Sequence, residues 1–309
     1  MALLRAEAEK LSNRYLEAGI IEELVTKDDM FAYLPFMQVN NKSYDYTRED
    51  EAAMTTAIGA DTHAKFVDVN ETIPEAAMSF VEVTAKLRAL IGDVDVDKFL
   101  QETMGDTNGQ KAAQIAAKAK IIRSKFQYTL ARGDSSTSPL EFDGLSKLVS
   151  AGQTIAAGPN GAVLDFDMLD ELKDKVNYGA DALVMSGKTW RYIKTMMRSL
   201  NIMPEHIALP EVGIMVPTYD GTPILRNDYL PVDEEKGSSG ATCTSVYAVR
   251  FNEDDGFFGL YGGPNAGIRI EEIGTVQNKD ATRTRIRWYC GTALKSTKAL
   301  ARLEGITLS

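Results

Sequence analysis

Cysteine and histidine are scarce in this sequence. The chain has two cysteines, Cys243 and Cys290, and two histidines, His63 and His206. The cysteines form no CxxC motif, so the sequence offers neither a disulfide framework nor a thiolate site, and it suits a reducing compartment. The histidines lie far apart, without Cys or carboxylate neighbours at metal-ligand spacing. We therefore expect no metal, no cofactor and no catalytic residues.

Long apolar runs and an excess of basic residues are also lacking. No window reaches the roughly 18 consecutive apolar residues of a membrane span, and the N-terminus has no apolar run of signal-peptide length. Acids outnumber bases by 44 to 34, which gives a net charge of -10 and a pI near 4.9. This balance argues against a protein that reads nucleic-acid sequence. We therefore expect neither a membrane protein nor a protein that binds specific nucleic-acid sequences. The overall composition is that of an ordinary globular protein.

One segment imitates a nucleotide site. Ser186-Gly187-Lys188-Thr189 follows an expected strand and precedes an expected helix, like the end of a phosphate-binding loop. The full pattern needs a glycine where Ala182 stands, and the residues between are expected in the strand. We therefore interpret Ser186 as a helix cap, and a nucleotide-binding enzyme using Gly187-Lys188-Thr189 as a minor alternative.

Three alternating acids, Asp93, Asp95 and Asp97, could suggest a cation site. The segment lacks the glycine turn and the distal glutamate of a calcium loop. Capping of the helix that begins in KFLQE explains these acids better.

Residues 107–132 form the longest helical pattern, because proline is absent and apolar residues recur at helical spacing. This segment contains no acid but six cations: Lys111, Lys118, Lys120, Arg123, Lys125 and Arg132. We expect their counter-charges on other parts of the fold or on other subunits, and we favour acids of the extended or N-terminal segments of another subunit.

Two flanking regions are predicted to lack a core of their own. Residues 2–25 have the apolar spacing of an amphipathic helix. Residues 42–91 contain two strand-like segments, SYDYTRE and FVEVTAKLRALI, separated by a polar stretch. The second shows strict alternation, so we expect a long two-stranded extension that leans on something outside itself.

The sequence after the helical segment of residues 107–132 predicts an α/β domain. A helix capped by Asp165 or Asp167, the buried strand ADALVMS, a helix from Lys188 and the turn in TYDGTPILRNDYLP follow one another. Further strands, SVYAVRF, GFFGLYGG and TRTRIRWYC, precede a short helix-like tail.

This order of elements resembles the major capsid protein of tailed bacteriophages, a fold shared with encapsulin shells. The resemblance spans nearly the whole chain and is carried by LPFMQV, YTRE, GDVDVDKFLQ, GDSS, FDGL, TYDGTPILRNDYLP, SVYAVRF, KDATRTRIRWYCGTAL and ALARLEGI. It implies an α+β fold with an arm (1–35), an extended loop (36–90), a peripheral domain with a spine helix (91–143), an axial domain (144–274) and a return to the peripheral domain (275–309).

The resemblance also implies a structural role rather than an enzymatic one. The subunit would assemble into the pentamers and hexamers of an icosahedral shell that encloses double-stranded DNA without sequence-specific binding. Expected partners are copies of itself, a portal protein and, optionally, a decoration protein. The location would be the virion, after assembly in the host cytoplasm. An encapsulin-type compartment with protein cargo is the alternative.

Seven residues are candidates for subunit interfaces: Tyr46, Arg48, Phe66, Lys118, Arg123, Asn278 and Lys279. Some members of the family cross-link a loop lysine to a peripheral asparagine, and Lys42, Lys65 and Asn278 lie in corresponding regions. They do not align as a reacting set, so we predict no cross-link. Text resembling the mature arm begins within a few residues of Met1, which leads us to expect a separate scaffolding protein rather than a fused segment.

Overall fold

The computed structural model describes residues 30, 33–49, 64–73, 75, 77, 79–103, 107–208, 215–238, 240, 242–263 and 268–308. The predicted arm helix over residues 2–25 and part of the predicted loop, residues 50–63, lie outside this part. No described helix combines the length and the apolar character that a membrane crossing needs.

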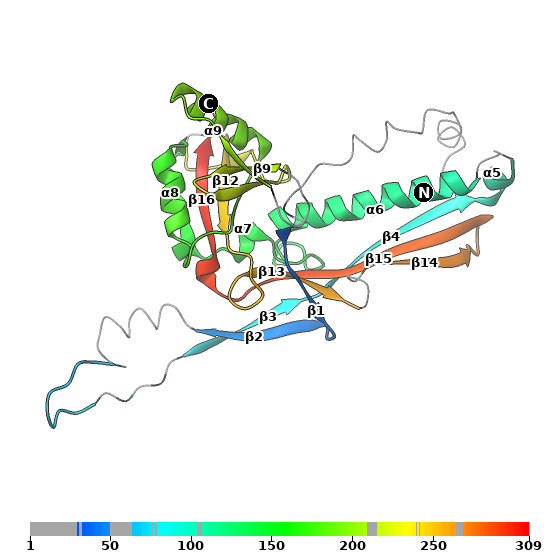
Figure 1. Ribbon diagram of the computed structural model, residues 1–309. Helices are drawn as coiled ribbons and strands as arrows, with labels where there is room; N and C mark the ends of the chain where they lie inside the picture. Colours follow the sequence, from blue (N-terminus) through cyan, green and yellow to red (C-terminus); the bar gives the residue numbers. More distant parts are fainter. Residues whose placement is uncertain are drawn as a thin grey trace.

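The longest element is helix α6 (Thr107–Arg132), which has the predicted bounds. It lies along a five-stranded sheet (Figure 1) with the order β1-β13-β15-β14, to which β4 is added by pairing with β15. These strands are β1 (Phe36–Val39), β4 (Arg88–Asp97), β13 (Phe257–Gly262), β14 (Ile268–Thr275) and β15 (Ala281–Leu294). The short helix α5 (Lys98–Thr103) follows β4.

Packing between α6 and this sheet follows from helical spacing. Ile122, Phe126 and Leu130 are buried, and because they are four residues apart they lie on one face of the helix. The Phe126 ring lies 4.5 Å from the Trp288 ring of β15, measured between centroids. Phe36 of β1 packs against both rings, and the predicted helix therefore has its core under its C-terminal half.

A second, nine-stranded sheet forms the other large unit. Its order is β5-β16-β12-β7-β10-β9-β8, with β11 paired to β12 and β6 to β16. The strands are β5 (Thr154–Ala156), β6 (Ala162–Val163), β7 (Ala182–Met185), β8 (Glu205–Ala208), β9 (Met215–Tyr219), β10 (Thr222–Arg226), β11 (Glu234–Glu235), β12 (Thr242–Val249) and β16 (Leu300–Thr307). Along the chain, α7 (Leu145–Leu148) and the 3-10 helix η1 (Ala151–Gln153) follow α6 and precede the first strand of this sheet.

Two helices cover one face of the nine-stranded sheet. Leu169 and Leu172 of α8 (Phe166–Asp174) and Ile193 and Met197 of α9 (Gly187–Ser199) are buried in one apolar cluster with residues of β7, β12 and β16. Asp165 caps α8, which decides between the two predicted candidates Asp165 and Asp167, and Ser186 caps α9 as predicted. The predicted turn at Asp220-Gly221 is also confirmed, since both residues have positive φ, 46° and 72°, as the favoured two-residue hairpin turns require.

The hairpin of β2 (Ser43–Glu49) and β3 (Phe80–Lys86) forms a two-stranded sheet of its own that projects from the body (Figure 1). The prediction of one strand through FVEVTAKLRALI is wrong, because the chain leaves the ladder at Leu87 between β3 and β4. The Leu87 amide donates to the Lys42 carbonyl at 3.0 Å, and its side chain packs beside the buried Phe258, Leu260 and Ala293.

The predicted helix-like tail is wrong. After the 3-10 helix η3 (Thr297–Ala299), the chain forms strand β16, which pairs with β12 on one side and with β5 and β6 on the other. Leu300, Ala301, Leu303 and Ile306 are buried, so an interior place in a sheet overrides the local helical pattern. Residues 275–309 are therefore divided between the two large sheets, and the domain boundaries stay predictions.

Candidate assembly surfaces

A row of ion pairs crosses the five-stranded sheet on the face away from α6. Arg283 of β15 binds Asp95 of β4 in bidentate fashion, with N–O distances of 2.6 and 2.7 Å. Arg285 binds Asp93 in the same way, at 2.7 and 2.8 Å. The pairs lie side by side because β4 and β15 are antiparallel with these residues in register. Hydrogen bonds from Arg285 and Arg283 lower the pKa of Asp93 and of Asp95 below its ordinary value.

The third arginine of this row extends the network to the edge strand. Arg287 pairs with Glu271 of β14, and its hydrogen bond lowers the pKa of that carboxyl. On the α6 side of β14, Glu272 pairs with Lys111. Charges thus fix β14 from both faces of the sheet.

The alternating acids have two roles rather than one. Asp97 accepts hydrogen bonds from the amides of Phe99 and Leu100, at 2.8 and 3.3 Å, which confirms the predicted helix cap. For Asp93 and Asp95 the capping interpretation is wrong, because their carboxylates pair with arginines. The signal was present in the sequence: Asp and Arg alternate at the same period in two segments, which indicates neighbouring strands.

Three cations of α6 have partners in the same chain. Lys111 pairs with Glu272, Lys125 with Glu141 at 2.7 Å, and Arg132 with Asp233 at 3.9 Å. These acids lie in β14, in the segment after α6 and beside β11. For these three cations the counter-charges are therefore on other parts of the same fold, and the favoured source, loop or arm acids of another subunit, is wrong.

The seat of the hairpin is apolar and contains one polar tether. Tyr44 and Tyr46 of β2 stack at 5.5 Å and pack beside the buried Phe258 and Ala293. The Tyr46 hydroxyl donates to the Leu294 carbonyl at 2.7 Å, and burial raises the pKa of Tyr46. The base of the hairpin is therefore anchored to β13 and β15.

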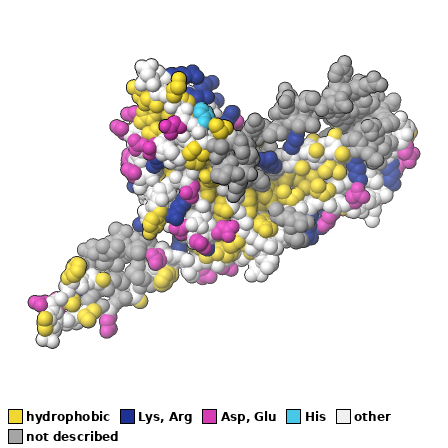
Figure 2. Space-filling model, viewed as in Figure 1, with side chains coloured by type: hydrophobic (Ala, Val, Ile, Leu, Met, Phe, Trp, Pro, Cys, Tyr) yellow, Lys and Arg dark blue, Asp and Glu magenta, His cyan; other side chains and the backbone are white. Residues whose placement is uncertain are grey.

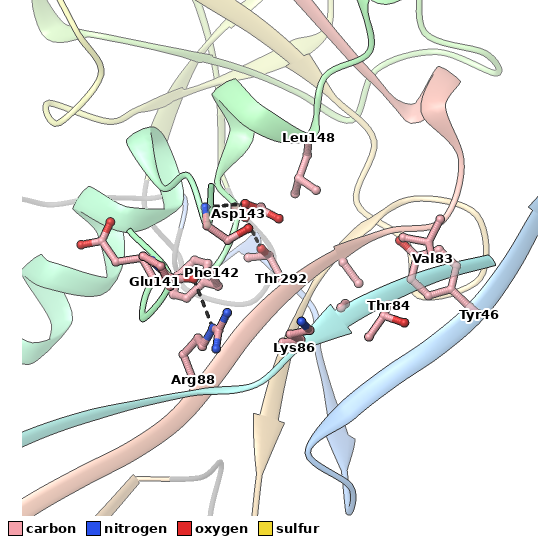
Figure 3. Close-up of a pocket in the computed structure, with 14 residues that line it drawn as sticks. Tyr46, Val83, Thr84, Lys86, Arg88, Glu141, Phe142, Asp143, Leu148 and Thr292 are labelled. Carbon is pink, nitrogen blue, oxygen red and sulfur yellow. Dashed lines mark hydrogen bonds between the residues drawn. The ribbon is translucent and has the colours of Figure 1, made fainter. Parts of the chain in front are cut away.

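A cavity of about 320 Å³ lies beneath this base (Figure 3). Its walls come from the hairpin, from residues 135–148 after α6 and from β15, and they include Lys86, Glu141 and Asp143. Arg88 closes one side by donating to the Glu141 carbonyl at 3.2 Å, and Thr292 another by donating to the Asp143 carbonyl at 2.5 Å. The cavity therefore lies between the hairpin and the body, next to the hydrogen bond from Tyr46 that anchors the hairpin.

Beyond the anchor, the extended loop exposes large apolar side chains. Phe66 is fully exposed, Val69 is 86% exposed, Ile73 71% and Phe80 63%. A monomeric surface rarely gathers so many along one projecting segment. This part of the loop is the clearest candidate for a contact with another molecule.

The seven predicted interface residues do not form one surface. Tyr46 lies in the hairpin seat, and Arg48 borders a groove with Asp254 and Lys295. Phe66 is fully exposed in the loop, and Lys118 lies over Gly92 of β4. Arg123 is exposed on α6, and Asn278 and Lys279 are exposed in the β14–β15 turn. Their interface role stays a prediction.

The segment that imitates a nucleotide site differs from a phosphate-binding loop. Strand β7 ends at Met185 and α9 begins at Gly187, so one residue connects them. Thr189 is buried, its amide donates to the Ser186 hydroxyl at 3.2 Å, and the two hydroxyls lie 3.0 Å apart. This geometry is a helix cap, without a backbone loop to surround a phosphate.

Together, the spine-like helix on a long sheet, the projecting hairpin and the separate α/β unit define the class: the chain has the tailed-phage capsid fold that encapsulins share. Over 100% of its length it is similar to the holo-SrpI encapsulin of Synechococcus elongatus PCC 7942, with a TM-score of 0.73, 18% identity and 98% of that chain covered. It is also similar to the capsid of a native GTA particle, with a TM-score of 0.64, 14% identity and 91% of each chain covered. For a protein of Microbacterium phage Oxtober96 the TM-score is 0.62, the identity 13% and the coverage 99% of each chain.

No protein-family model and no curated protein sequence matches the chain.

Proposed function

We propose that the protein is the major capsid subunit of a tailed bacteriophage, a structural protein that assembles into a closed shell. The observation that carries this proposal is the likeness of nearly the whole chain to the capsid of a native GTA particle, over 91% of each chain, and to a protein of Microbacterium phage Oxtober96, over 99% of each chain. Likeness over a full chain supports a shell role for the fold as a whole rather than for one part of it.

The exposed loop supports the same role. Its apolar residues, Phe66 to Phe80, have no core of their own in the described part of the chain, and apolar area that leaves water contributes about 25 cal/mol per Å². Contact with a neighbouring subunit would bury this area, while the anchored base keeps the direction of the loop. A rigid body with projecting segments suits a subunit that occupies several slightly different environments.

The finer features are part of the proposal. The shell would consist of pentamers and hexamers, enclose double-stranded DNA and be located in the virion after assembly in the host cytoplasm. A net charge of -10 suits a container that must not bind its genome tightly. A scaffolding protein, a portal protein and a decoration protein would be its further partners.

Electron microscopy of the purified protein, alone and with a scaffold, tests this function. Closed or tubular shells are the expected result, and a stable monomer under every condition would overturn it. An encapsulin-type compartment is the second candidate, because the fold is similar to the Synechococcus encapsulin at a TM-score of 0.73. Nucleic acid inside purified particles would favour the capsid, and a single enclosed protein would favour the compartment.

A further inference from the structure

Helix α9 has an exposed basic face. Its four cations, Lys188, Arg191, Lys194 and Arg198, are spaced by three or four residues and therefore lie on one side of the helix, which contains no acid. Within the described part of the chain, none of the four has an ion pair. Lys194 instead lies 5.4 Å from the ring of Trp190.

Helix α8 has an exposed acidic face. Asp167, Asp170, Glu171 and Asp174 follow the spacing i, i+3, i+4, i+7, which places them on one side. Asp170 accepts a hydrogen bond from the Tyr219 hydroxyl at 2.8 Å, and no ion pair forms at these four acids among the described residues.

The lysines near these acids are directed elsewhere. Lys173 pairs with Asp220 at 2.6 Å, and Lys175 donates to the Gly152 carbonyl at 3.4 Å. The acidic face of α8 is therefore not neutralised by its own helix.

Repulsion between like charges within each face destabilises the helix that carries it. Like charges four residues apart destabilise a helix by a few tenths of a kcal/mol, and Asp167–Glu171, Asp170–Asp174 and Lys194–Arg198 are such pairs. Lys188 in the first turn of α9 and Asp174 in the last turn of α8 also oppose the helix dipoles. Asp167 in the first turn of α8 and Arg198 in the last turn of α9 instead favour their helix dipoles. The other charges of the two faces do not stabilise the helices that carry them.

The two faces occupy different regions of the same domain. Figure 2 shows Lys and Arg side chains gathered over α9 and Asp and Glu side chains over α8. Helix α9 directly follows β7, whereas α8 packs over β12 and β16. No ion pair joins the two helices within the described part of one chain, so both faces are free to meet an oppositely charged surface outside it.

We propose that the basic face of α9 docks against the acidic face of α8 in a neighbouring copy of the chain. The contact joins different surfaces of the two copies, so it is head-to-tail and closes into a ring when repeated around a rotation axis. Charge complementarity sets the order and orientation of the copies, and desolvated pairs contribute most to it. This inference rests on the proposed function, since it names a contact between shell subunits.

Charge reversal tests the contact. One variant, Arg191→Glu with Arg198→Glu, reverses the basic face, and a second, Asp167→Lys with Glu171→Lys, reverses the acidic face. Circular dichroism and thermal unfolding establish that each subunit folds. We expect each variant alone to need at least about tenfold more protein to assemble, which corresponds to about 1.4 kcal/mol. The chain with all four substitutions keeps the net charge of the wild type and should assemble again.

Mixing the two reversed variants adds a second readout. A copy with two acidic faces and a copy with two basic faces can alternate, so the 1:1 mixture should form rings with an even number of copies. If the fourfold variant folds but does not assemble, or if both reversed variants assemble like the wild type, the proposal is wrong. It is also wrong if only the basic-face variant is impaired, because α9 would then bind something other than α8, such as nucleic acid.

The same mixture separates this proposal from the proposed function. If the wild-type protein formed no particles, the shell function would fail, but sedimentation of the mixed variants would still decide the contact. Heterodimers in the mixture that are absent from either variant alone would support it, and their absence would overturn it.

Discussion

At the scale of single residues, the bidentate pairs of Asp93 and Asp95 are the sharpest feature of the five-stranded sheet. The fork of each guanidinium matches both carboxylate oxygens, which makes these stronger than pairs with one hydrogen bond. Because both carboxyls have lowered pKa values when folded, their stabilisation is present above the ordinary carboxyl pKa of about 4. It is lost as the pH falls through the lowered, folded-state pKa.

Asp95→Asn should therefore lower the midpoint of thermal unfolding by a few degrees at pH 7 and by less near pH 3. The asparagine cannot carry the charge that Arg283 binds, and Arg283 would keep only Asp93, at 3.7 Å. Differential scanning calorimetry at both pH values measures the difference. Glu82→Gln, on the exposed part of β3, serves as the control; an equal effect of both substitutions would show that the pair does not stabilise the sheet.

Residue patterns alone predicted the helix caps and the turn, but they did not predict the ion pairs between β4 and β15. The caps at Asp165 and Ser186 and the Asp220-Gly221 turn depend on residues within a few positions, so they could be predicted. The partners of Asp93 and Asp95 lie about 190 residues away, and their assignment depends on strand register, which no local pattern contains.

At the scale of elements, the spine helix α6 could be predicted to the residue, whereas the strands flanking the hairpin and the tail could not. Helical spacing over 26 residues is a strong signal. The break at Leu87 depends on a hydrogen bond to Lys42 and on an apolar seat formed by distant strands. Strand β16 likewise depends on neighbours on both sides, which override its own propensity.

Docking of α6 on the sheet should depend on Phe126 far more than on any exposed residue of the helix. Phe126→Ala removes a fully buried ring between Phe36, Phe142 and Trp288 and should cost about 3–5 kcal/mol. Ile121→Ala, at a position 59% exposed on the same helix, should cost about 0.5 kcal/mol or less. Chemical denaturation of the unassembled subunit measures both, and similar losses would mean that the helix is not fixed through this aromatic cluster.

At the scale of the whole molecule, the described part of the chain combines a compact body with a projecting segment whose apolar side chains it leaves exposed. The elements of the body bury one another's apolar faces. Helix α6 covers the five-stranded sheet, and α8 and α9 cover one face of the nine-stranded sheet. The base of the hairpin formed by β2 and β3 is anchored through Tyr46 and the cluster around Phe258, while the described apolar residues of the loop beyond it are exposed. Folding and assembly should therefore depend on different residues.

Replacing the exposed apolar residues of the loop should separate these two processes. Phe66→Ser with Val69→Ser removes side chains that are fully and 86% exposed, so the free subunit should unfold at a temperature within about 1 °C of the wild type. Assembly should weaken at least tenfold in the protein concentration required, because burying two large side chains contributes about 1.5–3 kcal/mol each. Light scattering and electron microscopy measure assembly, and Leu140→Ser, at an exposed apolar position outside the loop, is the matched control. Normal shells from the loop variant would show that the loop does not hold neighbouring subunits, and a large loss of subunit stability would show that these side chains pack within their own chain.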